Sequence, residues 1–150
     1  MSRRKSRILA FQALYSWDVS KSSLDDILSF SWLQKDSEIE AGVEREEPSE
    51  TLKEEETFAS LIIKGTIDHI DEIDKLIESH LASNWSLDRI NRVALAILRT
   101  SAYEILFQKN IETKIVIDEA VNIAKDYGSD DSYKFINAVL DKIGKDEKDK

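Results

Sequence analysis

The first seven residues hold the densest group of side chains with a chemistry of their own. Arg3, Arg4, Lys5 and Arg7 place four positive charges, and no acid, within Met1–Arg7. A guanidinium group can form paired hydrogen bonds to phosphate oxygens, so this cluster predicts a site for a phosphate-bearing ligand such as RNA. The alternative is a solubilising or frayed terminus, and the charge pattern alone gives the two about equal weight.

Aromatic residues follow the cationic cluster on the same predicted helix, which spans about residues 3–19. The three arginines fall on the line that Phe11 and Tyr15 continue at helical spacing. An unpaired arginine cannot extend a core stripe, so the first turns are expected to overhang the end of the fold or to stay disordered. Exposed rings of Tyr15 or Trp17 could then stack on unpaired bases.

The overall charge does not exclude a polyanion as partner. The formal net charge is −9, and residues 36–56 alone carry −8 of it, with ten acids against two bases. At physiological salt, charges more than about 8 Å apart are largely screened from one another. A cationic terminus can therefore act independently of a distant acidic stretch.

Two further constellations lie in the second half of the chain. Arg92 and Arg99 share a helical face, and the pattern favours pairing with acids or packing on Tyr103 over contact with a ligand. The loop 128–132 opens the last helix, directly before Lys134 and Phe135. It is either an ordinary C-cap followed by an N-cap or an anion site at a helix N-terminus.

Other chemistries find little support. The chain has 0 Cys and 2 His, and His69 and His80 are roughly 16 Å apart along a helix, too far for one metal ion. Nucleophile and phosphate-cradling glycine motifs are absent, so we expect no catalytic site, no metal and no cofactor. No apolar run approaches the roughly 18 residues of a membrane span. The basic start lacks a signal-peptide cleavage site, and we expect a cytoplasmic protein.

The elements that position these residues are predicted to be helices. The 4 Gly and 1 Pro are too few turn-formers for a β-sandwich or barrel. Apolar spacing predicts a single all-α domain over residues 1–150, with six helices or seven, depending on whether Gly65 ends one. Ser86 is the expected N-cap of a central helix at about 87–107, and a helix at 113–127 turns Tyr127 inward. An acidic loop at about 36–50 and a frayed tail at 144–150 complete the expectation.

Three blocks of the C-terminal third, together with the opening helix, closely resemble the bacterial transcription antitermination factor NusB family. The opening helix matches through its arginine cluster followed by Ala13-Leu14-Tyr15-Ser16-Trp17. The similarity covers nearly the whole chain except about 36–56. The matching C-terminal blocks are Ala96-Ile97-Leu98-Arg99 with Ala102-Tyr103-Glu104, Asp118-Glu119-Ala120-Val121 continuing through Ile123-Ala124-Lys125 to Tyr127-Gly128, and Asp131-Ser132 continuing through Lys134-Phe135-Ile136-Asn137 to Val139-Leu140-Asp141.

The resemblance implies an all-α fold of two three-helix halves and no enzyme activity. Proteins of this family bind the boxA element of ribosomal RNA leaders with a NusE partner, the small-subunit ribosomal protein, in a complex on RNA polymerase with other Nus factors. By matching position, the implied RNA-binding residues are Arg3, Arg4, Lys5, Arg7, Tyr15, Asp131, Ser132, Lys134 and Phe135. The implied partner-binding residues are Arg99, Glu104 and Phe135.

The sequence also departs from the family pattern. Ala94-Leu95 stands where an acidic-basic pair is usual, which puts part of a polar partner contact in doubt. The acidic stretch 36–56 is expected either to repel non-specific RNA or to compete for the basic terminus. Two alternatives stay open, a helical adaptor that binds only protein and a stand-alone RNA-binding relative of the N-terminal domain of ribosomal RNA methyltransferases. Whether the free protein forms a homodimer is also open.

Overall fold

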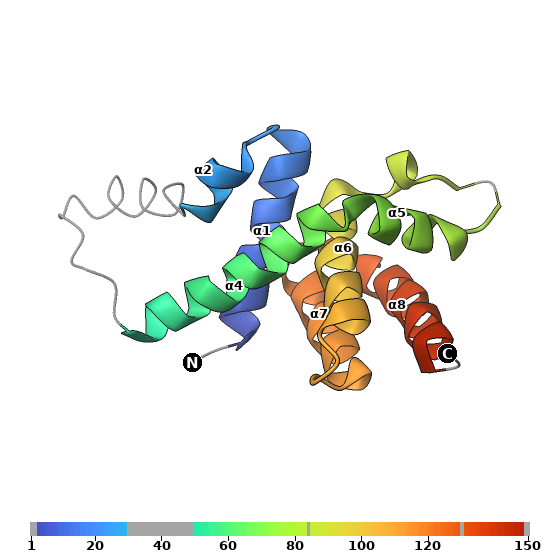
Figure 1. Ribbon diagram of the computed structural model, residues 1–150. Helices are drawn as coiled ribbons and strands as arrows, with labels where there is room; N and C mark the ends of the chain where they lie inside the picture. The colour runs from blue at the N-terminus through green and yellow to red at the C-terminus, as the bar shows by residue number, and fades with distance from the viewer. Residues whose placement is uncertain (1–2, 30–49, 84, 130, 149–150) are drawn as a thin grey trace.

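The computed structural model describes residues 3–29, 50–83, 85–129 and 131–148. Across these ranges the chain is helical and contains no strand (Figure 1). The elements are α1 (Arg3–Val19), α2 (Leu24–Leu28), α4 (Glu50–Asp68), α5 (Ile70–Ser79), the short 3₁₀ helix η1 (Leu87–Arg89), α6 (Arg92–Phe107), α7 (Thr113–Tyr127) and α8 (Ser132–Lys148).

Helix α6 is the centre of the fold. Every residue from Ala94 to Ile105 is buried, because α1, α4, α5, α7 and α8 all pack against this helix. Helices α6, α7 and α8 form one half of the bundle, and α1, α4 and α5, with the short α2 at their edge, form the other (Figure 1). The predicted all-α bundle of two halves is confirmed, including a central helix that several neighbours enclose.

The predicted cap of the central helix needs correction, and the open question at Gly65 is answered. The N-cap of α6 is Asn91, whose side chain accepts hydrogen bonds from the backbone N–H groups of Val93 and Ala94. Ser86 instead precedes η1 and makes no side-chain cap. Gly65 does not end a helix: it lies within α4, where an added Cβ would come within 2.2 Å of the Tyr103 ring. The glycine therefore lets α4 approach α6 closely.

The predicted frayed tail is wrong as far as Lys148, because α8 continues through Gly144. Gly144 is buried against α7, and an added Cβ would lie 2.7 Å from the Thr113 side chain. The last turns have contacts outside α8: an Asp146 carboxylate oxygen lies 2.8 Å from His80 Nε2, and Glu147 forms an ion pair with Lys109 at 2.7 Å. The alternating charges predict fraying, whereas Asp146 and Glu147 have partners outside α8.

The predicted acidic loop at 36–50 lies outside the described residues, except for Glu50, which opens α4. Among the residues that the structure does describe, no helix is long and apolar enough to cross a membrane.

Candidate nucleic-acid interface

The first three residues of α1 are Arg3, Arg4 and Lys5, which we call the cationic turn. All three residues are exposed. The Arg3 guanidinium lies over the Phe58 ring, 3.8 Å from its centroid. The Arg4 Nε donates a hydrogen bond to Glu119 at 3.2 Å, and this bond raises the pKa of Arg4 above its usual value. The start of α1 is thus a helical turn with side-chain contacts to α4 and α7.

Arg7 does not belong to this exposed group, which corrects the prediction that it contacts RNA. Its side chain is buried and binds Glu104 of α6 with two nitrogens. Nε lies 3.0 and 3.1 Å from the two carboxylate oxygens, and Nη2 lies 3.0 Å from Oε1. The core stripe can include an arginine here because the charge meets a carboxylate in paired geometry. Arg7 therefore fastens α1 to α6 below the cationic turn.

Glu104 is correspondingly internal, with only 2% of its surface exposed. Burial raises the pKa of the Glu104 carboxyl above its usual value, while the hydrogen bonds and charge of Arg7 act in the opposite direction. A direct contact between Glu104 and a protein partner, as predicted, requires an exposure that this structure does not give it. Its role here is structural.

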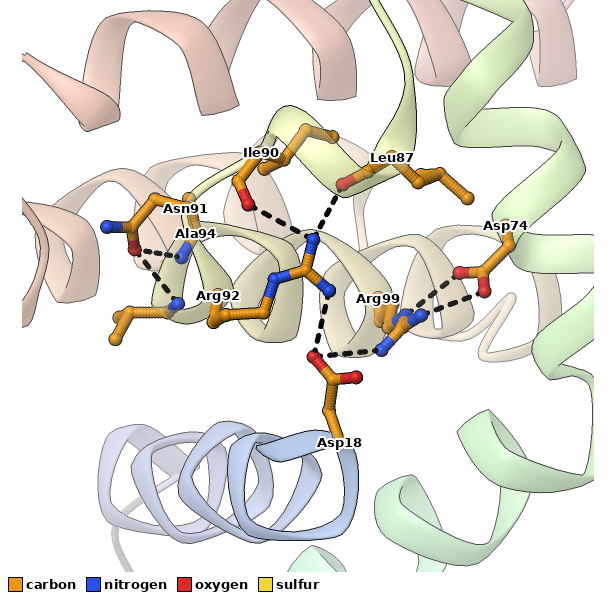
Figure 2. A network of polar contacts seen from close by, with 9 residues as sticks. Asp18, Asp74, Leu87, Ile90, Asn91, Arg92, Ala94 and Arg99 are labelled. Atoms are coloured by element: carbon orange, nitrogen blue, oxygen red, sulfur yellow. Dashed lines mark hydrogen bonds and ion pairs between the residues drawn. The ribbon is translucent and has the colours of Figure 1, made fainter. Parts of the chain in front are cut away.

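Arg99 is also engaged inside the fold, in a network that spans α1, α5 and α6 (Figure 2). Its Nε and Nη2 donate to the two oxygens of Asp74 at 2.8 and 2.9 Å, and Nη1 lies 3.8 Å from Asp18. Arg92 donates to the same Asp18 carboxylate at 3.2 Å and to the Leu87 carbonyl at 2.8 Å. The alternative of pairing with acids is confirmed for both arginines. Like Glu104, Arg99 is buried, so its predicted contact with a protein partner requires an exposure that the structure does not give it.

Tyr15 lies beside a feature that the sequence did not reveal, a shallow hollow of about 190 Å³. We call it the tyrosine hollow, and its lining residues are Phe11, Gln12, Tyr15, Val93 and Tyr127. Both tyrosines are exposed, by 38% and 47%. The prediction that Tyr127 points inward is wrong: its ring touches Phe11 of α1, but nearly half of this last residue of α7 is exposed. Its position directly before Gly128 was the available signal.

Side chains of α1 and α7 meet at two levels, which places the tyrosine hollow relative to the cationic turn. At the start of α1, Arg4 contacts Glu119. Further along α1, at the end of α7, the rings of Phe11 and Tyr127 lie 5.4 Å apart. Eleven residues of helix separate Arg4 from Tyr15, roughly 16 Å along the axis. A flat aromatic site and a cationic site thus occur on one side of α1 at a separation that a short single strand can span.

The start of α8 holds the other predicted residues, Asp131, Ser132, Lys134 and Phe135. Lys134 is exposed, with its Nζ 3.8 Å from Asp131, and the Ser132 hydroxyl donates to the Ser129 carbonyl at 3.0 Å. Phe135 is partly buried against the core. Packing on its apolar neighbours therefore covers only part of its side chain, and the rest stays accessible to a ligand or partner. Sequence reasoning missed Trp85, which is exposed and packs on Phe135 at a ring distance of 6.5 Å.

The two histidines have structural surroundings. His69 and His80 flank α5 at its two ends, and the His69 ring stacks on Phe107 with centroids 4.1 Å apart. Among the described residues, no group of three or more His, Cys, Asp or Glu side chains is arranged to hold a metal ion.

Comparison with known proteins agrees with this architecture. The NusB family pattern matches residues 4–145. Transcription antitermination protein NusB of Treponema denticola is 50% identical over 143 residues, covering 95% of this chain and 96% of that protein. The solved structure of T. maritima NusB superimposes with a TM-score of 0.78 at 33% identity, over 97% of this chain and 92% of that one. A crystal structure of antitermination factors NusB and NusE in complex with dsRNA matches with a TM-score of 0.73 at 28% identity, over 96% of each chain. The chain therefore belongs to the NusB family.

Proposed function

We propose that this protein is a transcription antitermination factor that binds boxA RNA of ribosomal RNA leader transcripts together with a NusE partner. It performs no catalysis and acts by binding. Membership of the NusB family supports the general role, and one structural neighbour was solved with NusE and dsRNA. The observation that carries the proposal is the exposed cationic turn, which the buried pair of Arg7 and Glu104 holds in place.

The cationic turn is suited to bind the RNA backbone. Arg3 and Arg4 keep donors that their contacts with Phe58 and Glu119 do not use, since a guanidinium has five N–H groups. Arg4 lies in water, where an ion pair with Glu119 contributes little, so a phosphate can replace the carboxylate at low cost. Lys5 adds a third positive charge to the same turn.

Base recognition is assigned to the aromatic surfaces. Tyr15 and Tyr127 can hold unpaired bases in the tyrosine hollow, because stacking on an aromatic ring suits every base. Lys134 supplies a further cation at the start of α8, with Asp131, Ser132 and Phe135 beside it. Phe135 is also the remaining candidate for contact with NusE. Contact with RNA polymerase and other Nus factors is indirect in this proposal, and the protein acts in the cytoplasm.

The test is filter binding of a boxA RNA to the protein with NusE, titrated against salt. If three or four phosphates are neutralised, log K should fall against log salt with a slope of about −2 to −3 for a single strand. A scrambled RNA of equal length should bind more weakly with a similar slope. A flat slope, or binding to NusE with no RNA bound, would favour the protein-only adaptor instead.

A further inference from the structure

Trp85 is an exposed indole in a defined position. It lies in the connection between α5 and η1 and is 46% exposed. Its backbone N–H donates to the Ala82 carbonyl at 2.8 Å, which closes a turn beneath it. Its ring lies 6.5 Å from that of Phe135 with an interplanar angle of 33°. The indole therefore lies against Phe135 and leaves nearly half of the Trp85 surface open to solvent.

The ring beside Trp85, that of Phe135, is attached to the core. Phe135 packs against the hydrophobic core, and it stands in the first turn of α8 directly after the exposed Lys134. The Lys134 ammonium lies near Asp131 and over the Tyr133 ring, in the same first turn as Phe135. Aromatic rings and cations on one surface are what single-stranded nucleic-acid sites use, with the ring for the base and the cation for the phosphate.

The surroundings of Trp85 fit a base better than a protein surface. Its chain neighbours Ala82, Ser83, Ser86 and Asp88 are exposed and small or polar. A protein interface of standard size covers about 800 Å² on each partner around an apolar centre. The rings of Trp85 and Phe135, with the partly buried Leu87, form a patch too small for such a centre, whereas one flat face is enough for one base. Arg89, also exposed, closes η1 just after Trp85 and adds a second cation to this surface.

We propose that Trp85 is an additional base-binding residue, which stacks on an unpaired nucleobase while Lys134 and Arg89 neutralise the flanking phosphates. This inference rests on the proposed RNA-binding function and extends its surface from the start of α8 to the connection before η1. RNA bound at the cationic turn and the tyrosine hollow would then continue past Phe135 onto the indole.

The experiment measures affinity of boxA RNA for the full chain with NusE. Trp85→Ala should weaken binding about 5- to 150-fold, the range for loss of one stacked base. Trp85→Phe keeps a flat ring and should retain most of the affinity. Ile115→Ala is the matched control, because Ile115 is 47% exposed at the opposite end of α7 from Tyr127 and should leave binding unchanged. RNA carrying 5-iodouridine should form a photocrosslink to the peptide that contains Trp85.

The outcomes separate this inference from the function on which it rests. If the wild type binds RNA, Trp85→Ala binds it with the same affinity and no crosslink forms, the role of Trp85 is overturned. The RNA-binding function then stays intact. Weaker NusE binding by Trp85→Ala without RNA would assign the indole to the protein partner and also overturn it. Absence of wild-type RNA binding would refute the proposed function itself, and this extension with it. Unchanged thermal unfolding of Trp85→Ala and Trp85→Phe verifies that the fold is intact in these variants.

Discussion

The arginines of α1 divide into two classes although they lie within five residues of one another. Arg4 is exposed and meets Glu119 in solvent, while Arg7 is 8% exposed and is held by Glu104 inside the fold. The same side chain is thus available to a phosphate in one case and fixes two helices in the other. The difference teaches that cationic clusters must be separated by burial before any member is assigned to a ligand.

The largest effect should come from removing one partner of the buried pair. Glu104→Ala leaves the Arg7 guanidinium buried without a counter-charge, and we expect a loss of about 3–5 kcal/mol in the free energy of unfolding. Urea denaturation measures it. The double variant Arg7→Met with Glu104→Leu removes both charges and should recover most of the loss. A Glu104→Ala protein of near wild-type stability would abolish the distinction between the two arginine classes.

A smaller loss is expected in the second internal network. Asp74→Asn removes the charge that accepts two hydrogen bonds from Arg99, and hydrogen bonds to charged groups are worth about 1.5–3 kcal/mol. We place the loss at the lower end of that range because Asp18 remains near the guanidinium. Asp71→Asn, an exposed position on the same helix, serves as control and should change stability by no more than about 0.5 kcal/mol. Equal losses in the two variants would show that the network adds nothing.

The exposed arginine should affect binding and not folding. Arg4→Glu is expected to lower RNA affinity about tenfold or more and to make the salt slope shallower by about 0.7, with unfolding changed by less than about 1 kcal/mol. Filter binding and thermal unfolding give the two quantities. Lys75→Glu, the same charge change at an exposed site on α5, should leave both nearly unchanged. If Arg4→Glu unfolds the protein, Arg4 belongs with Arg7 and the comparison fails.

The smallest effect is the pH dependence of the buried pair. Because the pKa of Glu104 is raised in the folded state, the folded protein binds this proton more readily than the unfolded chain. Its contribution to stability is full below the unfolded pKa and declines as pH rises through the folded one. The difference in unfolding free energy between wild type and Glu104→Gln should therefore shrink from pH 4.5 upwards. A difference that grows as pH rises would show that Arg7 lowers the pKa of Glu104 by more than burial raises it.

Periodicity predicted helices far better than it predicted their ends and exposures. The helix over 113–127 matches α7 because a regular apolar stripe precedes Gly128, which ends it. The central helix was expected to begin at about residue 87, but a 3₁₀ turn intervenes and Asn91 supplies the cap. A helical pattern does not state which neighbours cover each turn, so it predicts a buried Tyr127 and a frayed tail where the structure has an exposed ring and a continuous α8.

The candidate site was foreseen only in part, for the same reason. Arg3, Arg4, Lys5 and Lys134 are exposed as an RNA-contacting role requires, and that role stays a prediction. The tyrosine hollow and the pairing of Trp85 with Phe135 join residues that are far apart in the chain, and they have no signature in sequence.

Composition and apolar spacing by themselves determined that this chain forms helices around one enclosed central helix and begins with a run of cations. The tertiary structure decided which of those cations face water. Arg7 and Glu104 lie 97 residues apart in the chain, and no local pattern connects them. Only the packing of α1 against α6 brings this carboxylate and this guanidinium together. Because a charge is costly to bury without a partner, Arg7 can be buried only where Glu104 pairs with it, while the arginines without such a partner stay in water.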